Sequence, residues 1–237
     1  MGKGNLLHPR RLWFVIVALV VGSATGCAGG PEDRDGARAA AGGTSATATP
    51  TPGGSFGTPG GEALTGRALL EALRDGGHHV VFRHAATDHA TPDAGDVDLG
   101  DCGTQRNLSD AGRADAHAIG RAFRELGIPV ADVLTSPYCR TKETGRLAFG
   151  RATATPELER LWPEDEPADR LAARRLEPLL RQAPASGRNN VLVVHGHYTR
   201  ALDGIELAEG EAAVYRPGTG GPVRVARVLA RAWTELA

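Results

Sequence analysis

Short apolar runs that alternate with amphipathic segments constrain the fold of this chain most strongly. Three runs, 79–82, 130–134 and 191–194, have the length of buried strands. Between the first two, residues 109–126 repeat apolar side chains every three or four positions, which is the period of a helix with one buried face. Strands that alternate with helices predict an α/β sandwich of three layers, in which helices flank a mostly parallel sheet.

The same alternation extends over residues 62–237, and the length of this segment suits a single domain. Further elements are expected where apolar residues repeat at helical or strand spacing. They are helices at 64–74, 138–149 and 170–182, and strands at 212–215 and 223–228. The last two strands are expected to close one edge of the sheet.

Residues 1–27 have the features of an export signal. A basic start precedes a ten-residue apolar run at 12–21, which is too short to span a membrane. Small residues then lead to Cys27, and this arrangement resembles the bacterial lipobox. The resemblance implies a lipid on Cys27 and an outward-facing lipoprotein on the bacterial cell membrane. The alternative is a plain signal peptide and a secreted protein.

The segment 28–61 differs in composition from the domain that follows it. Of its 34 residues, 28 are Gly, Ala, Thr, Pro or Ser. Such a stretch cannot bury enough apolar surface to offset the entropy lost on ordering. We therefore expect a disordered tether between the signal and the domain.

The whole-chain composition excludes two classes of protein. The chain has 27 Lys and Arg residues against 28 Asp and Glu residues. Because nucleic-acid-binding proteins usually carry a basic excess, we expect no nucleic-acid partner. Three cysteines are too few for a disulfide-dense scaffold.

Histidine and arginine side chains follow the predicted strands at the points where these strands end. Arg83 and His84 follow the first strand, Arg140 comes shortly after the second, and His195 follows the third. The carboxyl ends of parallel strands share one edge of the sheet, so these side chains can converge there. A neutral imidazole can accept a phosphoryl group, and arginine can bind two phosphate oxygens at once. The pattern favours phosphoryl transfer.

Four motifs in this region resemble those of the histidine phosphatase superfamily, which has the phosphoglycerate mutase-like fold. Residues 80–85 (VVFRHA) resemble its Arg-His-Gly signature, with Ala85 in place of Gly. Residues 136–144 resemble its Ser-Pro-x-x-Arg-x-x-x-Thr segment, and 195–202 resemble the motif of its second histidine. Residues 107–113 are similar to the turn that opens its second helix.

The resemblance implies a role for each matching residue. His84 would be the phosphorylated nucleophile, and Arg83, Arg140 and His195 would complete the phosphate pocket. Three further residues are expected to extend the site toward the substrate: Gln105, Arg106 and His197. The general acid that protonates the leaving alcohol is expected to be Glu159 or Glu209. Without such an acid, substrates with good leaving groups would be favoured.

Cys102 and Cys139 would be an even pair in an oxidising compartment if Cys27 is lipidated. We expect either a disulfide that holds the loop around Gln105 over the site, or two free buried thiols. Both cysteines lie within three residues of a predicted pocket residue.

The function expected from these features is that of an exported phosphatase, with a small phosphorylated substrate and no cofactor. Three alternatives stay open: a non-catalytic phosphate- or phosphosugar-binding lipoprotein, a phosphomutase, and a metal hydrolase. The last rests on the His-x-His pair of His195 and His197, which is a plausible ligand pair for a metal. The sequence does not name the substrate.

Overall fold

The computed structural model of the chain describes residues 63–236. The predicted export signal with Cys27 and the whole of the predicted tether therefore lie outside the described residues. Within 63–236, no helix combines the length and the apolar composition that crossing a membrane requires.

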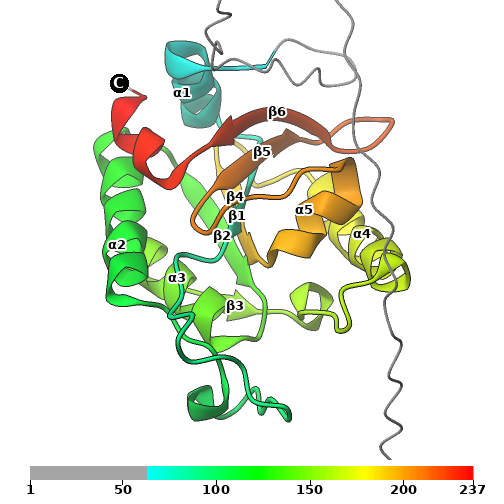
Figure 1. Cartoon of the computed structure of the whole chain (residues 1–237). Coiled ribbons are helices and arrows are strands. Elements are labelled where there is room, and N and C mark those ends of the chain that lie inside the picture. The colour runs from blue at the N-terminus through cyan, green and yellow to red at the C-terminus, as the bar shows by residue number, and fades with distance from the viewer. Residues whose placement is uncertain (1–62, 237) are drawn as a thin grey trace, which may run out of the picture. The chain divides into compact units, whose positions relative to one another are not determined.

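The centre of the domain is a six-stranded sheet with the strand order β3-β2-β4-β1-β5-β6 (Figure 1). The strands are β1 (His79–Arg83), β2 (Val130–Thr135), β3 (Thr153–Ala154), β4 (Asn189–Val194), β5 (Ala212–Arg216) and β6 (Val223–Val228). The first four in spatial order pair in parallel, and β5 and β6 add to β1 as antiparallel strands. The predicted α/β class is confirmed, as are the two predicted edge strands.

Helices cover both faces of this sheet (Figure 1). They are α1 (Gly66–Asp75), α2 (Asp110–Glu125), α3 (Cys139–Phe149), α4 (Glu166–Arg181) and α5 (Gly196–Asp203), with 3₁₀ turns η1 (Cys102–Thr104), η2 (Pro156–Leu158) and η3 (Ala230–Glu235). Neighbouring strand residues face opposite layers, as a pleated strand requires. Val80 and Phe82 pack with α1, α2 and η3, whereas Val81 packs with α4 and α5.

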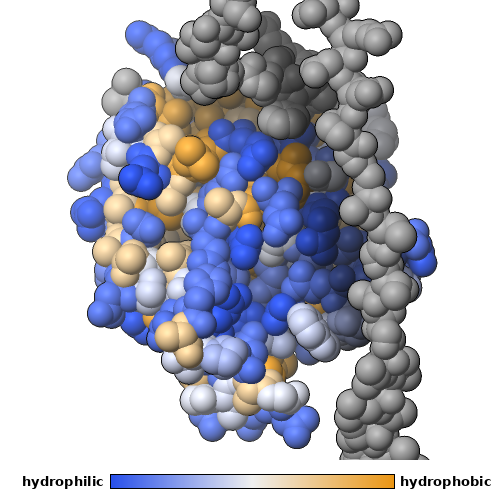
Figure 2. Space-filling view, viewed as in Figure 1, coloured by the Kyte–Doolittle hydropathy of each residue, from blue (hydrophilic) through white to orange (hydrophobic). Residues whose placement is uncertain are grey.

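The outer surface of the domain is mostly hydrophilic on the face that Figure 2 shows, with apolar residues visible only in small separate patches. The large apolar side chains are instead gathered in the two layers between sheet and helices. Burial of these two layers is the main favourable term that holds the helices on the sheet.

Helix α2 begins where the sequence predicts, because Ser109 caps it. The Ser109 hydroxyl accepts a hydrogen bond from the Gly112 amide at 3.1 Å. A side chain at position 112 would overlap the carbonyl of Ala86, two residues after His84. Glycine here therefore lets the start of α2 pack against the segment that carries His84.

Three elements differ from the expectation. Helix α4 begins at Glu166 rather than at 170, because the Asp165 side chain accepts a hydrogen bond from the Ala168 amide and caps an earlier turn. Helix α5 begins directly after His195, in a segment expected only as a strand end. The short strand β3 was also not expected.

Candidate active site

The three strands that carry the predicted site residues are neighbours in the sheet. Arg83 pairs with Val194 across β1 and β4, and Thr135 pairs with Val193 across β2 and β4. The amide of His84 then donates to the carbonyl of Val194 at 3.0 Å. The residues that follow β1, β2 and β4 therefore start from one edge of the sheet.

His84 is buried, with 2% of its surface exposed. The hydrogen bond that its ring makes determines which ring nitrogen carries the proton. Its Nδ1 lies 2.9 Å from the carbonyl oxygen of Ala85. Because a carbonyl oxygen only accepts hydrogen bonds, Nδ1 carries the proton and Nε2 keeps its lone pair. Burial and the nearby Arg140 guanidinium lower the pKa of His84 well below its ordinary value of 6.5. The ring is therefore neutral at pH 7.

His195 lies beside His84, with their ring centroids 5.5 Å apart. Its Nε2 is 2.9 Å from the hydroxyl of Ser136, which follows β2. Burial and then the charge of Arg140 also lower the pKa of His195 well below 6.5. The structure thus brings His84 and His195 together as two neutral imidazoles next to a guanidinium.

Arg140, in the first turn of α3, is fully buried. Its Nη1 donates to the Asp93 carboxylate at 3.0 Å and to the Arg106 carbonyl at 3.2 Å. Its Nε and Nη2 are buried and find no partner within residues 63–236. Buried donors normally have partners, so these two guanidinium nitrogens are free to bind an anionic ligand. Arg140 is the charge that acts most strongly on both His84 and His195, so this ligand site adjoins both rings.

Arg83 is held at the same edge by a backbone contact. Its Nη1 donates to the Leu207 carbonyl at 2.8 Å, while its buried Nε has no partner in the described part of the chain. A side chain at position 196 would come within 3.2 Å of Arg83 Nη1. The glycine that follows His195 therefore leaves room for the Arg83 guanidinium.

Glu209 connects two of the predicted site arginines. Its two carboxylate oxygens accept hydrogen bonds from the amide and the hydroxyl of Thr87, at 3.0 and 2.7 Å. The same carboxylate lies 3.9 Å from Arg83 and 3.8 Å from Arg106. Glu209 thus lies between Arg83 and Arg106 at the site.

Glu159, the other predicted acid, lies after the 3₁₀ turn η2. Its carbonyl accepts a hydrogen bond from the Tyr198 hydroxyl at 2.7 Å, which fixes the backbone there. The residue is partly buried, and its negative charge acts on Tyr138. Its carboxylate has no hydrogen-bond or ion-pair partner in the described region.

Two predicted substrate-binding residues, Gln105 and His197, are buried and contact other parts of the protein. Gln105 is 1% exposed, and its amide donates to the Asp98 carbonyl and accepts from the Cys139 amide, both at 2.8 Å. His197 lies behind His195, with the two rings stacked nearly parallel at 6.1 Å, because the first turn of α5 directs it inward. Gln105 thus fixes a loop and His197 is a buried neighbour of His195, so these contacts add no support for a substrate-binding role at either residue.

The stacking also bears on the proposed pair of metal ligands. The rings of His195 and His197 lie one over the other, and His195 Nε2 is directed at Ser136. Two rings stacked in this way do not direct their nitrogens at a common point. Within 63–236, no group of three or more His, Cys, Asp or Glu side chains is arranged to hold a metal ion.

Asp93 is a site residue that sequence reasoning missed. Its carboxylate accepts from Arg140 Nη1, from Arg160 Nη1 at 3.1 Å and from the Arg106 amide at 2.8 Å. The residue lies in a long polar loop without apolar periodicity, so no pattern in the sequence indicates it. Its contacts fix the Arg140 guanidinium through one nitrogen and leave the other two donors free.

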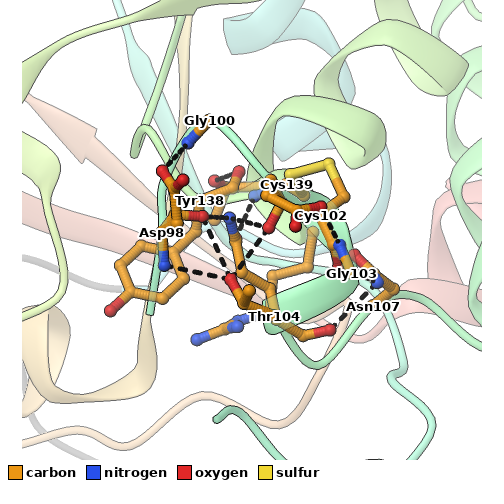
Figure 3. The surroundings of a disulfide bond; sticks show 12 residues. Asp98, Gly100, Cys102, Gly103, Thr104, Asn107, Tyr138 and Cys139 are labelled. Atoms are coloured by element: carbon orange, nitrogen blue, oxygen red, sulfur yellow. Dashed lines mark hydrogen bonds between the residues drawn. A yellow bond between two sulfur atoms is a disulfide. The ribbon is translucent and has the colours of Figure 1, made fainter. Parts of the chain in front are cut away.

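A disulfide joins Cys102 in η1 to Cys139 at the start of α3, directly before Arg140 (Figure 3). Hydrogen bonds between Thr104 and Asp98, and one from the Asn107 side-chain amide to the Cys102 carbonyl at 2.7 Å, order the loop around it. The disulfide therefore ties the loop that carries Asp93 and Arg106 to the helix that carries Arg140.

Reduction of this disulfide is expected to lower the free energy of unfolding by about 3–4 kcal/mol, because it releases a closed loop of several tens of residues in the unfolded chain. Urea unfolding of the full chain with and without reductant measures this difference. The double variant Cys102→Ala/Cys139→Ala is the control and should not respond to reductant. Unchanged wild-type stability, or recovery of both thiols free by non-reducing peptide mapping, would contradict the bond.

Part of the chain matches the model of a known protein family. Residues 80–167 match the model of the Histidine phosphatase superfamily (branch 1), a stretch that includes His84 and Arg140 and ends before His195. No curated protein sequence matches the chain.

Similar solved structures include phosphoserine phosphatase from Entamoeba histolytica in complex with 3-phosphoglyceric acid (13% identity, 63% of this chain and 95% of that chain, TM-score 0.49). They also include TTHB049 from Thermus thermophilus, with 20% sequence identity over 63% of this chain and 99% of that chain, and a TM-score of 0.42. A third is the protein histidine phosphatase SixA complexed with tungstate, with 17% sequence identity over 65% of this chain and 97% of that chain, and a TM-score of 0.45. Residues 80–167 are therefore similar to the histidine phosphatase superfamily (branch 1), in agreement with the motifs at 80–85 and 136–144.

Proposed function

We propose that the chain is a phosphatase that hydrolyses a small phosphomonoester through a phosphohistidine on His84. The main support for this proposal is the position of the Arg140 guanidinium beside the His84 imidazole. The buried Arg140 keeps two donor nitrogens without partners beside an imidazole whose Nε2 lone pair is available. A phosphoryl group would fill this place, because its oxygens accept from the guanidinium while its phosphorus faces the nitrogen.

In the first step, Nε2 of His84 attacks the phosphorus, an N–P bond forms and the P–O bond to the alcohol breaks. The departing alcohol oxygen takes a proton from a general acid. In the second step a water attacks the phosphorus, the N–P bond breaks and inorganic phosphate leaves. The water's proton returns to the acid, which completes the cycle.

The arginines of the site stabilise the charge that the phosphoryl oxygens carry through both steps. Arg83 and Arg140 act as fixed cations, held by the Leu207 carbonyl and by Asp93. The Ala85 carbonyl holds the proton on Nδ1, so that the attacking nitrogen is always Nε2. His195 adds a hydrogen-bonding ring on the side of Ser136.

We assign the proton donor to Glu159 rather than Glu209. Both oxygens of Glu209 are used by Thr87, and its place between Arg83 and Arg106 suits the positioning of these guanidiniums. The Glu159 carboxylate has no such partner within the described residues and lies near Tyr138, which contacts the His195 ring.

The lowered pKa of His84 predicts how the activity depends on pH. A group with a pKa below 6.5 keeps its neutral, nucleophilic form as the pH falls through 6.5. We therefore expect p-nitrophenyl phosphate to be hydrolysed by the full chain, with the acidic limb of kcat/KM well below pH 6.5. A chelator should not change the rate. No turnover, or an acidic limb at or above 6.5, would contradict the proposal.

We further propose that the enzyme is exported and carries its lipid on Cys27. The support is the signal-like composition of 1–27 and the small residues before Cys27. Fractionation of cells that express the chain should find it with the membrane, and Cys27→Ser should release it. An unchanged membrane fraction for Cys27→Ser would overturn the anchor.

A further inference from the structure

A cavity of about 630 Å³ opens directly beside the phosphate pocket. Its wall includes Asp93, Arg106 and Tyr138, all of which are close to Arg140. The Tyr138 ring lies 4.5 Å from the Arg140 guanidinium carbon and 5.1 Å from the His195 ring. A phosphate held by Arg140 would therefore direct the rest of its molecule into this cavity.

Trp162 provides the outer wall of the cavity. Its side chain is 76% exposed, and only Leu229 shares this property among the large apolar residues of 63–236. The indole ring lies 4.8 Å from the Arg160 guanidinium carbon. An exposed indole ring that also lines a cavity can pack against a ligand that enters this cavity.

Asp93 couples the Trp162 wall to the phosphate pocket. One of its oxygens accepts from Arg140 and the other accepts from Arg160. Glu164 also accepts from Arg160, at 2.8 Å, so the cation beneath Trp162 is fixed from two sides. The aromatic wall and the phosphate-binding guanidinium thus hold one geometry relative to each other.

The charges on the cavity wall favour a neutral ring over a second anion. Arg160 is paired with Asp93 and Glu164, and Arg106 lies near the Glu209 carboxylate. The rest of the lining consists of the His89 imidazole, the rings of Tyr138 and Trp162, and small or apolar residues such as Pro92 and Val97. Its volume lies in the range of sites for small organic molecules.

We propose that this cavity binds the alcohol part of the substrate and that this part carries a flat aromatic or heteroaromatic ring, which packs against Trp162. The inference rests on the proposed phosphatase activity and adds the class of its substrate. Trp162 acts here as a specificity-determining residue, because it contacts the leaving group and not the reacting phosphorus.

Two substrates of similar size and leaving-group chemistry test the proposal: benzyl phosphate and cyclohexylmethyl phosphate. Both release a primary alcohol, so a difference in kcat/KM reports on the ring. We expect the full chain to prefer benzyl phosphate about tenfold. Trp162→Leu should bring the ratio of the two kcat/KM values close to one, with the larger loss on benzyl phosphate, and Trp162→Phe should keep most of the preference.

Leu229→Ala is the control, since it removes the other exposed large apolar side chain and should leave the ratio unchanged. Equal kcat/KM values for the two esters in the wild type, or an unchanged preference in Trp162→Leu, would overturn the aromatic subsite alone. Hydrolysis of neither ester nor of p-nitrophenyl phosphate would instead overturn the phosphatase function.

Discussion

Replacement of His84 by alanine is expected to lower kcat for p-nitrophenyl phosphate by at least about 10⁴-fold, because the variant lacks the nitrogen that accepts the phosphoryl group. The His84 ring makes none of the contacts that hold Arg83, Arg140 and Glu209 in place. The variant should therefore still bind inorganic phosphate. Stopped assays with purified full chain give the rate, and calorimetry gives the affinity for phosphate.

His79→Ala is the matched control for this variant. His79 is also buried and lies on β1, at the opposite end of the strand from His84, with its Nε2 against the Gln182 carbonyl at 2.8 Å. Loss of either ring removes a buried imidazole, so both variants should lose stability. Only His84→Ala should lose turnover. Equal rates in wild type and His84→Ala would contradict the assigned nucleophile.

Replacement of Arg140 by alanine is expected to lower kcat/KM by about 10³-fold. The variant loses the two unpartnered donors that face the phosphate site, and it leaves Asp93 paired only with Arg160 and the Arg106 amide. Arg140→Lys should recover little of the loss, because an ammonium cannot bond Asp93 and two phosphate oxygens in one planar fork. The affinity for inorganic phosphate should fall with the rate.

Arg146→Ala is the control for Arg140, because it removes an arginine from the last turn of the same helix, outside the site. It should change kcat/KM by less than about twofold. A rate in Arg140→Ala within tenfold of the wild type would show that the guanidinium does not bind the reacting phosphate.

The sequence predicted the part of the site that follows from topology. His84, Arg140 and His195 each follow a short apolar run, and parallel strands bring the ends of such runs to one edge of the sheet. Apolar periodicity located the helices that pack on the sheet, such as α2, because burial sets both the pattern and the element.

The sequence could not predict which way single side chains point. Gln105 lies next to Arg106 in the chain, yet its amide faces Cys139 while the Arg106 side chain approaches Glu209. His197 is two residues after His195, and the first turn of α5, which no capping signal indicated, directs it behind His195. Asp93 stayed hidden because its role depends on Arg140, 47 positions away in the sequence.

Trapping of the phosphorylated enzyme shows whether His84 accepts the phosphoryl group. The full chain would be mixed with p-nitrophenyl phosphate, quenched under alkaline conditions that preserve phosphohistidine, digested, and mapped by mass spectrometry. We expect one phosphoryl group on the peptide that contains His84, and none in His84→Ala. Rapid turnover without a phosphopeptide at His84, or with phosphate on another residue, would contradict it.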